Sequence, residues 1–283
     1  YCIFRSFKEC VDRADADQAA WRERMAIDAD FVQACGYHTV DVSPCADGRL
    51  QGLLPFVLRM APNDKVFVKA YAGAMFDVEG DVADWSQREL DRLSGGLPGG
   101  EAANYLKIAV YHFSTSHPCQ QGCAAHGSQD SRAVESALGR LNELRAAIEN
   151  TYGRGAAPEV LLIGVDTDVD SIRVHLPDAN GDVNPYRYVD TGEAYKATLG
   201  MDPAAARAHL AEMLVRAERA DGWAEGEGSM NQGMRQLVLR LLEANLSQIE
   251  YVIQHHAGRY AVIGHDEEFI CAGEAMSELQ LRN

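Results

Sequence analysis

Long apolar runs are missing from this sequence of 283 residues, which begins at Tyr1 rather than at a methionine. No apolar stretch approaches the roughly 20 residues that a membrane-spanning helix needs. The first residues also lack the basic segment followed by an apolar one that marks a secretory signal. The sequence therefore predicts a protein without a membrane partner.

Basic residues are scarce, with 26 lysines and arginines against 42 aspartates and glutamates, and the net charge is −16. Binding to phosphate backbones needs a basic surface, so this balance argues against a nucleic-acid partner.

The seven cysteines are an odd number and do not show the regular spacing of small disulfide-rich proteins. Their pattern favours a reducing compartment with free or metal-bound thiols over a disulfide framework. Neither a phosphate-binding Walker motif nor a Gly-x-Ser-x-Gly elbow occurs.

The remaining sequence alternates between strand-like and helix-like segments. Residues 1–35 are predicted to be helical, and residues 53–60 a helix or turn. We expect strands at about 37–42, 65–75, 105–112, 159–165 and 171–176, and helices at about 130–153, 203–220 and 230–256. Within the first of these helices, Asp130 is the candidate N-cap and Gly153 the candidate stop. Such alternation predicts the α/β class with a largely parallel sheet.

Three reactive side chains follow the first expected strand. Cys45, Asp47 and Arg49 lie two residues apart, directly after Ser43-Pro44. On an extended segment, residues two apart point the same way, so these side chains are expected to share one pocket. The pocket would combine a thiolate, a carboxylate and a guanidinium.

A histidine and another cysteine complete a potential metal site. His112 ends the third expected strand, and Cys123 lies eleven residues beyond it. The carboxyl ends of parallel strands meet at one edge of a sheet, where α/β proteins build their sites. We therefore expect Cys45, His112 and Cys123 to converge. Zinc held by three protein ligands keeps a fourth position for water or substrate, as in catalytic sites.

Two other interpretations of these residues are open. A local structural zinc site could form within the loop from His117, Cys119, Cys123 and His126, or the loop residues could bind nothing. Asp47 and Arg49 favour the catalytic arrangement, because arginine holds a carboxylate in two hydrogen bonds and a structural zinc site needs neither residue. If it left the arginine, Asp47 could itself bind the metal.

The motif Cys45-Ala-Asp-Gly-Arg49, followed by a histidine at a strand end and a later cysteine, resembles the β-class carbonic anhydrases. In most of that class the histidine and second cysteine are three apart, whereas ten residues separate His112 from Cys123 here. The longer loop H-F-S-T-S-H-P-C-Q-Q-G-C and the phrase C-A-D-G-R-L-Q-G are similar to the divergent carboxysomal shell carbonic anhydrases, formerly the ε class. The resemblance runs from about Val42 to Asn283.

This resemblance implies a β-carbonic-anhydrase-like, mostly parallel sheet flanked by helices. It also implies one Zn²⁺ per chain, held by Cys45, His112 and Cys123, with a catalytic Asp47–Arg49 pair at the open position. The implied reaction is attack of zinc hydroxide on CO2 to give bicarbonate. Loop residues His117 and His126 are candidate proton shuttles because histidine titrates near neutral pH.

The family also implies an organisation and a location. Residues 1–35 would be a helical N-terminal segment and residues 36–283 the zinc catalytic domain, without the decayed C-terminal repeat of the family. The protein would be a homodimer or an oligomer of dimers in the carboxysome, within the bacterial cytoplasm. It would supply CO2 to Rubisco and contact shell proteins or Rubisco. The alternatives are a non-catalytic, zinc-stabilised shell or scaffold protein, and a different zinc hydrolase.

One further motif, Asp166-Thr-Asp-Val-Asp170, resembles the start of a calcium-binding loop. The sixth position of that loop is normally glycine and the twelfth glutamate, but here they are Ser171 and Pro177. We therefore predict that these carboxylates belong to a turn or to the surface.

Overall fold

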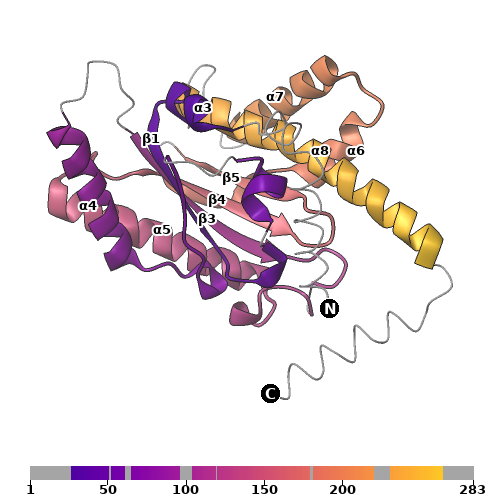
Figure 1. Ribbon diagram of the computed structural model, residues 1–283, viewed down its shortest axis with the longest axis horizontal. Helices are drawn as coiled ribbons and strands as arrows, with labels where there is room; N and C mark the ends of the chain where they lie inside the picture. Colours follow the sequence, from indigo (N-terminus) through magenta and orange to yellow (C-terminus); the bar gives the residue numbers. More distant parts are fainter. Residues whose placement is uncertain are drawn as a thin grey trace.

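A six-stranded sheet forms the centre of the protein (Figure 1), with strand order β2-β1-β3-β4-β5-β6. The computed structural model describes residues 27–50, 52–60, 65–95, 104–118, 120–178, 181–219 and 230–263, with side chains to 253. Strands β2, β1, β3 and β4 run parallel, β5 is antiparallel to its neighbour β4, and β6 is antiparallel to β5. The strands are β1 Tyr37–Pro44, β2 Val66–Val68, β3 Asn104–Phe113, β4 Glu159–Asp166, β5 Ile172–Pro177 and β6 Val183–Asp190. The predicted α/β class with a mostly parallel sheet is confirmed.

Helices cover both sides of the sheet. Helices α4 and α5 lie along one side, and α3, α6, α7 and α8 lie together on the other (Figure 1). Their bounds are α3 Ala29–Ala34, α4 Val78–Ser94, α5 Asp130–Tyr152, α6 Thr191–Thr198, α7 Pro203–Arg219 and α8 Gln232–Ile263. Short 3-10 helices, η1 (Gly48–Leu50), η3 (Ala72–Ala74) and η4 (Ala124–His126), and a short π-helix, η2 (Leu53–Leu58), lie in the connections. Among the helices of these described stretches, none is long and apolar enough to cross a membrane.

Helix α5 forms because small and aliphatic residues recur every three or four positions and face the sheet. Ala133, Ala137, Leu141, Leu144 and Ile148 are buried, which is the spacing of one helical face. The predicted stop at Gly153 is confirmed, since this residue is the C-cap. The predicted N-cap is wrong: Gln129 occupies that position, and Asp130 is the first residue of the helix.

Several other predicted elements need correction. The strand expected at 65–75 ends at Val68, because Tyr71 forms an isolated bridge with Cys45 and Gly73 turns the chain at φ +64°. Helix α4 was not predicted, since Val78 is its only buried apolar residue and a few partly buried apolar residues complete its inner face. Strand β6 and helix α6 were also missed. Of the helical segment expected at 1–35, residues 1–26 lie outside the described part of the chain.

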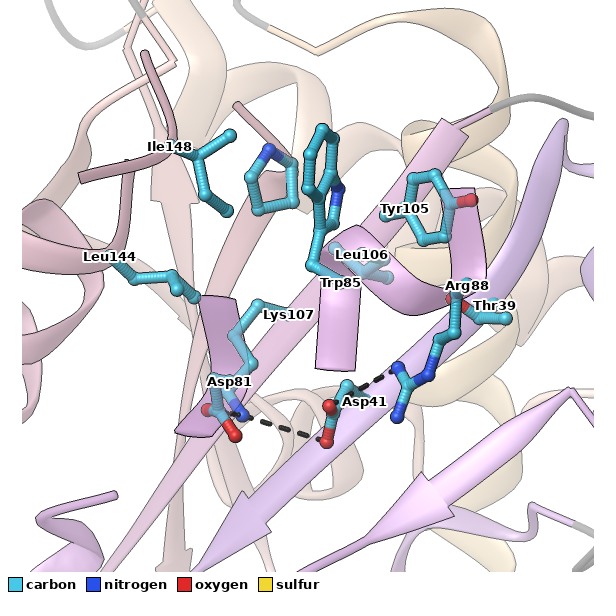
Figure 2. A pocket seen from close by; sticks show the side chains of 11 residues that line it. Thr39, Asp41, Asp81, Trp85, Arg88, Tyr105, Leu106, Lys107, Leu144 and Ile148 are labelled. Carbon is cyan, nitrogen blue, oxygen red and sulfur yellow. Dashed lines mark hydrogen bonds and ion pairs between the residues drawn. The ribbon is translucent and has the colours of Figure 1, made fainter. Parts of the chain in front are cut away.

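A buried cluster of charges ties the sheet to α4 (Figure 2). Lys107 of β3 is 2% exposed and forms an ion pair with Asp81 of α4. Its ammonium also donates to Ser43 Oγ at 2.8 Å and lies 3.5 Å from Asp41 Oδ1 of β1. Asp41 in turn pairs with Arg88 of α4 at 3.3 Å. Two cations thus face two carboxylates, and removal of Lys107 leaves the buried carboxylate of Asp81 without its ion-pair partner.

Candidate metal centre

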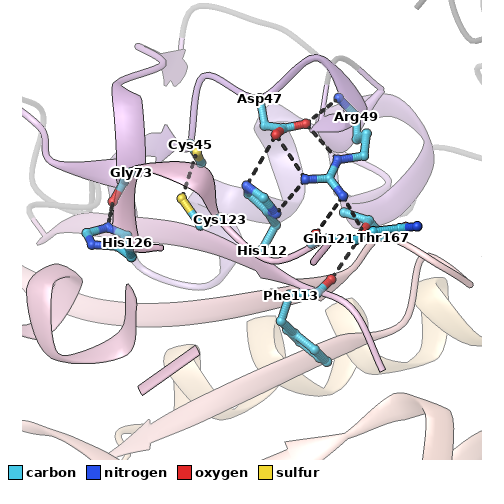
Figure 3. Close-up of polar contacts among 10 residues, drawn as sticks. All are labelled: Cys45, Asp47, Arg49, Gly73, His112, Phe113, Gln121, Cys123, His126 and Thr167. Atoms are coloured by element: carbon cyan, nitrogen blue, oxygen red, sulfur yellow. Dashed lines mark hydrogen bonds and ion pairs between the residues drawn. The ribbon is translucent and has the colours of Figure 1, made fainter. Parts of the chain in front are cut away.

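Cys45, His112 and Cys123 meet at the carboxyl edge of the parallel strands (Figure 3). The backbone amide of Cys45 donates to the carbonyl oxygen of Val110 at 2.9 Å, which sets the end of β1 beside the end of β3. Cys123 returns to this edge just before η4. The three residues are 6%, 1% and 3% exposed, and one ligand atom from each lies within 4.8 Å of the others. The convergence predicted from strand ends is therefore confirmed.

The donor atoms fit a tetrahedral metal ion. The sulfur atoms of Cys45 and Cys123 are 3.7 Å apart, and two thiolates about 2.3 Å from a tetrahedral zinc are separated by roughly 3.8 Å. A disulfide would require a distance of about 2.05 Å. Nε2 of His112 is buried without a hydrogen-bond partner among the residues that the structure describes. Two thiols and an otherwise unsatisfied imidazole nitrogen suit zinc.

The two thiols differ in pKa, so Cys45 loses its proton more readily than Cys123. A hydrogen bond from Cys123 lowers the pKa of the Cys45 thiol, and His112 lowers it further against the opposing effect of burial. The same contact, together with burial, raises the pKa of Cys123. Thiolate is the form that binds metal. Binding of a metal ion would therefore release the proton held at Cys123.

The Asp47–Arg49 pair stands at the opening of this buried group. Asp47 Oδ1 accepts from Arg49 Nε at 2.9 Å, and Oδ2 accepts from Nη2 at 3.0 Å. Burial alone would raise the pKa of Asp47, but the hydrogen bonds and charge of Arg49 outweigh it and lower that pKa. Asp47 Oδ2 lies 3.4 Å from His112 Nε2. The side chains of Asp47 and Arg49 are 24% and 36% exposed, so the pair lies between the buried donors and solvent.

The route by which these side chains meet differs from the prediction. The segment after Cys45 is not extended: Asp47 Oδ1 accepts from the backbone amide of Arg49 at 2.9 Å, and η1 begins at Gly48. This side-chain-capped turn folds Arg49 back onto Asp47. The pairing therefore depends on turn chemistry rather than on the alternation of a strand.

Arg49 also contacts two groups that were not predicted. Its Nη1 donates to the carbonyl oxygen of Gln121 at 2.7 Å and to Thr167 Oγ1 at 3.3 Å. On the other side of the guanidinium, Nη2 lies 3.4 Å from Nδ1 of His112. The only sequence signal for Thr167 was its place in the aspartate-rich motif after β4.

Neither loop histidine that the structure describes belongs to the group of three mutually close donors. His117 is exposed, and Nε2 of His126 lies 2.9 Å from the carbonyl oxygen of Gly73. Cys119, the remaining member of the alternative local zinc site, lies outside the described residues. Within the described ranges, the group of mutually close donors contains only Cys45, His112 and Cys123.

The aspartate-rich motif forms the predicted turn, but its first carboxylate is not on the surface. Asp166 is 2% exposed and accepts from Thr115 Oγ1 at 2.6 Å. Burial raises the pKa of Asp166, an effect that its hydrogen bonds partly offset. Asp168 accepts from the backbone amide of Ser116 at 2.7 Å. The motif is therefore bound to the loop that carries Cys123.

Comparison with known proteins identifies relatives along most of the chain. Residues 27–265 match the family described as Carboxysome Shell Carbonic Anhydrase, catalytic domain. A protein named carboxysome shell carbonic anhydrase from Halothiobacillus neapolitanus is 52% identical over 257 residues, covering 89% of this chain and 50% of the relative. Proteins of the same name from Hydrogenovibrio crunogenus and Prochlorococcus marinus are 43% and 38% identical, covering 94% and 100% of this chain and 50% and 54% of those relatives.

The chain thus spans about half the length of the curated relatives it matches. The family match nevertheless covers both cysteines, the histidine and the Asp47–Arg49 pair of the site. Taken with this match, the identities show that the chain belongs to the carboxysome shell carbonic anhydrase family.

Proposed function

We propose that this chain is a carbonic anhydrase that interconverts CO2 and bicarbonate. The observation that carries the proposal is a buried Cys45–His112–Cys123 group beside a fixed Asp47–Arg49 pair. Its family membership supports the same reaction. In this proposal the three buried residues hold one zinc ion per chain, and Asp47 and Arg49 act at the open side.

Each residue of the pair has a separate role in the proposed reaction. Zinc with three protein ligands supplies hydroxide at neutral pH. Arg49 keeps Asp47 ionised and fixes both of its oxygens. Asp47 Oδ2 lies 3.4 Å from His112 Nε2, at the open side of the three donors. There its carboxylate would accept a hydrogen bond from the hydroxide that the metal would supply and would orient that hydroxide toward the carbon of CO2. Because the pair is partly exposed, substrate and product exchange past it.

We expect removal of zinc to abolish the activity reversibly. Treatment with a chelator should remove one zinc per chain and reduce stopped-flow CO2 hydration to background, and added zinc should restore the rate. Unfolding temperature should fall in the zinc-free protein, since an ion that binds only the folded state stabilises it. Full activity without zinc would contradict the proposal. Zinc-dependent stability without CO2 hydration would instead support a non-catalytic scaffold.

Replacing Asp47 by asparagine is expected to reduce kcat by about a hundredfold, because a neutral amide is a weaker proton acceptor. Zinc content should remain unchanged, since Asp47 lies outside the group of three mutually close donors. Asp84→Asn is the matched control, as Asp84 is a partly exposed carboxylate paired with Lys69. Normal turnover by Asp47→Asn would exclude the assigned role. Stopped-flow kinetics and metal analysis on all three proteins provide the comparison.

We further propose that the protein works in the carboxysome, where the CO2 it releases would reach Rubisco. The names of its relatives support this location. The same proposal includes assembly as a homodimer or an oligomer of dimers, and contacts with shell proteins or Rubisco. It also divides the chain into an N-terminal segment (1–35) and a catalytic domain (36–283). Light scattering of the purified protein, alone and mixed with Rubisco, would measure the assembly state and the Rubisco contact.

A further inference from the structure

The turn that follows β4 lies beside both the end of β3 and Arg49. Strand β4 pairs with β3 up to the contact of Asp166 with Phe113. The backbone amide of Thr167 then donates to the carbonyl oxygen of Phe113 at 3.0 Å. Because Phe113 directly follows His112, this register places the turn after β4 beside His112, at the same edge of the sheet as Cys45. Three of the four parallel strands, β1, β3 and β4, thus contribute to one site.

Thr167 uses its hydroxyl in two directions (Figure 3). The hydroxyl donates to the Phe113 carbonyl oxygen at 3.2 Å and accepts from Arg49 Nη1 at 3.3 Å. A hydroxyl group can donate and accept at once, whereas the methyl group of valine can do neither. Thr167 therefore connects the guanidinium of Arg49 directly to the backbone of β3.

The two aspartates beside Thr167 fix the turn to the loop after β3. Asp168 accepts from Ser114 Oγ at 2.9 Å and from the Ser116 amide at 2.7 Å, and Asp166 accepts from Thr115 Oγ1 at 2.6 Å. The same loop supplies the Gln121 carbonyl oxygen to Arg49. The contacts of Arg49 Nη1 with Gln121 and Thr167 therefore come from a single hydrogen-bonded unit.

We propose that Thr167 is a positioning residue for the CO2 hydration proposed above: it holds the guanidinium of Arg49 so that Nε and Nη2 face Asp47. This inference rests on the proposed function for its kinetic consequence. Of the two contacts of Nη1, the one to Gln121 comes from the middle of a loop, whereas Thr167 is bonded to a strand. Without Thr167, Arg49 can rotate about its remaining contacts, and Asp47 loses its fixed orientation.

The test compares Thr167→Val and Thr167→Ser with the unmodified chain. Valine keeps the shape of threonine without its hydroxyl, and serine keeps the hydroxyl without the methyl group. We expect Thr167→Val to lower kcat and kcat/KM for CO2 hydration about tenfold. An effect of this size is typical when a residue that orients a metal ligand or a catalytic side chain is lost. KM, zinc content and unfolding temperature should stay close to those of the unmodified chain, and Thr167→Ser should recover most of the rate.

A structural readout separates this role from general stability. Crystal structures of Thr167→Val and the unmodified chain should differ in the position of Arg49 Nη1. Thr151→Val is the matched control, because Thr151 on α5 donates only to a carbonyl within its own helix. It should leave both rate and Arg49 unchanged. Unchanged kcat with Arg49 in place in Thr167→Val would overturn the inference.

If the proposed function is wrong, the kinetic and structural measurements would give a different combination of results. If the unmodified zinc-loaded chain does not hydrate CO2, the proposed reaction is wrong. The position of Arg49 then decides the inference alone: displacement in Thr167→Val supports the positioning role, and no displacement overturns it.

Discussion

Replacing Cys45 by alanine is expected to remove zinc from the protein and to lower CO2 hydration by roughly a thousandfold or more. The substitution leaves one thiol and one imidazole from the group of three donors. Two protein ligands hold zinc far more weakly than three, and the chain without metal retains no source of hydroxide at neutral pH. Metal analysis and stopped-flow hydration on the same preparation measure both effects.

Cys35→Ala provides a matched control for loss of a buried thiol. Cys35 is 5% exposed, like Cys45, but it is the C-cap residue of α3. Burial raises the pKa of its thiol and outweighs the opposing charge of Arg240, so Cys35 is protonated at neutral pH and poorly suited to bind metal. Cys35→Ala should therefore retain zinc and activity and show only a modest loss of stability from the small cavity that it leaves.

Comparison with His126→Ala tests the alternative local zinc site. Nε2 of His126 lies near the Gly73 carbonyl oxygen, so its loss should leave zinc content unchanged. Zinc retained in Cys45→Ala but lost in His126→Ala would contradict the assigned ligands. That result would also remove the structural reason for a catalytic Asp47–Arg49 pair, since a zinc held entirely within the loop would leave that pair without a function.

The metal centre could be predicted from sequence because it depends on strand ends. Cys45 and His112 each stand at the carboxyl end of a recognisable apolar strand, and parallel strands bring those ends together whatever their separation in sequence. Cys123 is less constrained by this rule, because a loop can return to many places. Its prediction depended on its place in the loop that follows His112 and on the need of a catalytic zinc for a third protein ligand, and the resemblance to the carbonic anhydrases implied the same residue.

Contacts made by polar groups in turns could not be predicted in the same way. Thr167 touches Arg49 across 118 residues of sequence, and the aspartates around it resemble those of any surface turn. Helix α4 was missed for a related reason: Asp81 occupies a buried position on its inner face, where apolar periodicity would normally mark a helix. Burial of a charged residue follows from its partner, and that partner, Lys107, is distant in sequence.

Because the Lys107–Asp81 ion pair is buried, the substitution Lys107→Met is expected to destabilise the folded protein by about 3–5 kcal/mol. The substitution leaves Asp81, 4% exposed, without its ion-pair partner, and removes the donor to Ser43. Asp41 keeps Arg88 as a partner. Denaturant unfolding at neutral pH measures the loss. Lys69→Met is the control, because Lys69 pairs with Asp84 in a partly exposed position where an ion pair contributes less than about 1 kcal/mol.

The pH dependence of this loss identifies its cause. Burial raises the pKa of Asp81, and Lys107 partly offsets that rise, so the pKa should rise further in Lys107→Met. A carboxyl group whose pKa is higher in the folded than in the unfolded protein destabilises the folded state once the pH exceeds the unfolded-state pKa, and the penalty is complete above the folded-state pKa. The penalty therefore disappears as the pH falls to the unfolded-state pKa. The stability difference from the unmodified protein should therefore narrow from pH 7 toward about pH 4.

A second substitution distinguishes unpaired charge from lost packing. In Lys107→Met/Asp81→Leu, both members of the ion pair are replaced by apolar side chains, which removes the uncompensated carboxylate. Replacing a whole buried ion pair is often neutral or stabilising, whereas removing one partner is costly. The double variant should therefore recover most of the lost stability at pH 7 and lose the pH dependence. If it remains as unstable as Lys107→Met, the contact of the Lys107 ammonium with the Phe76 ring, 4.4 Å from its centroid, and the packing of the lysine stem contribute the stability instead.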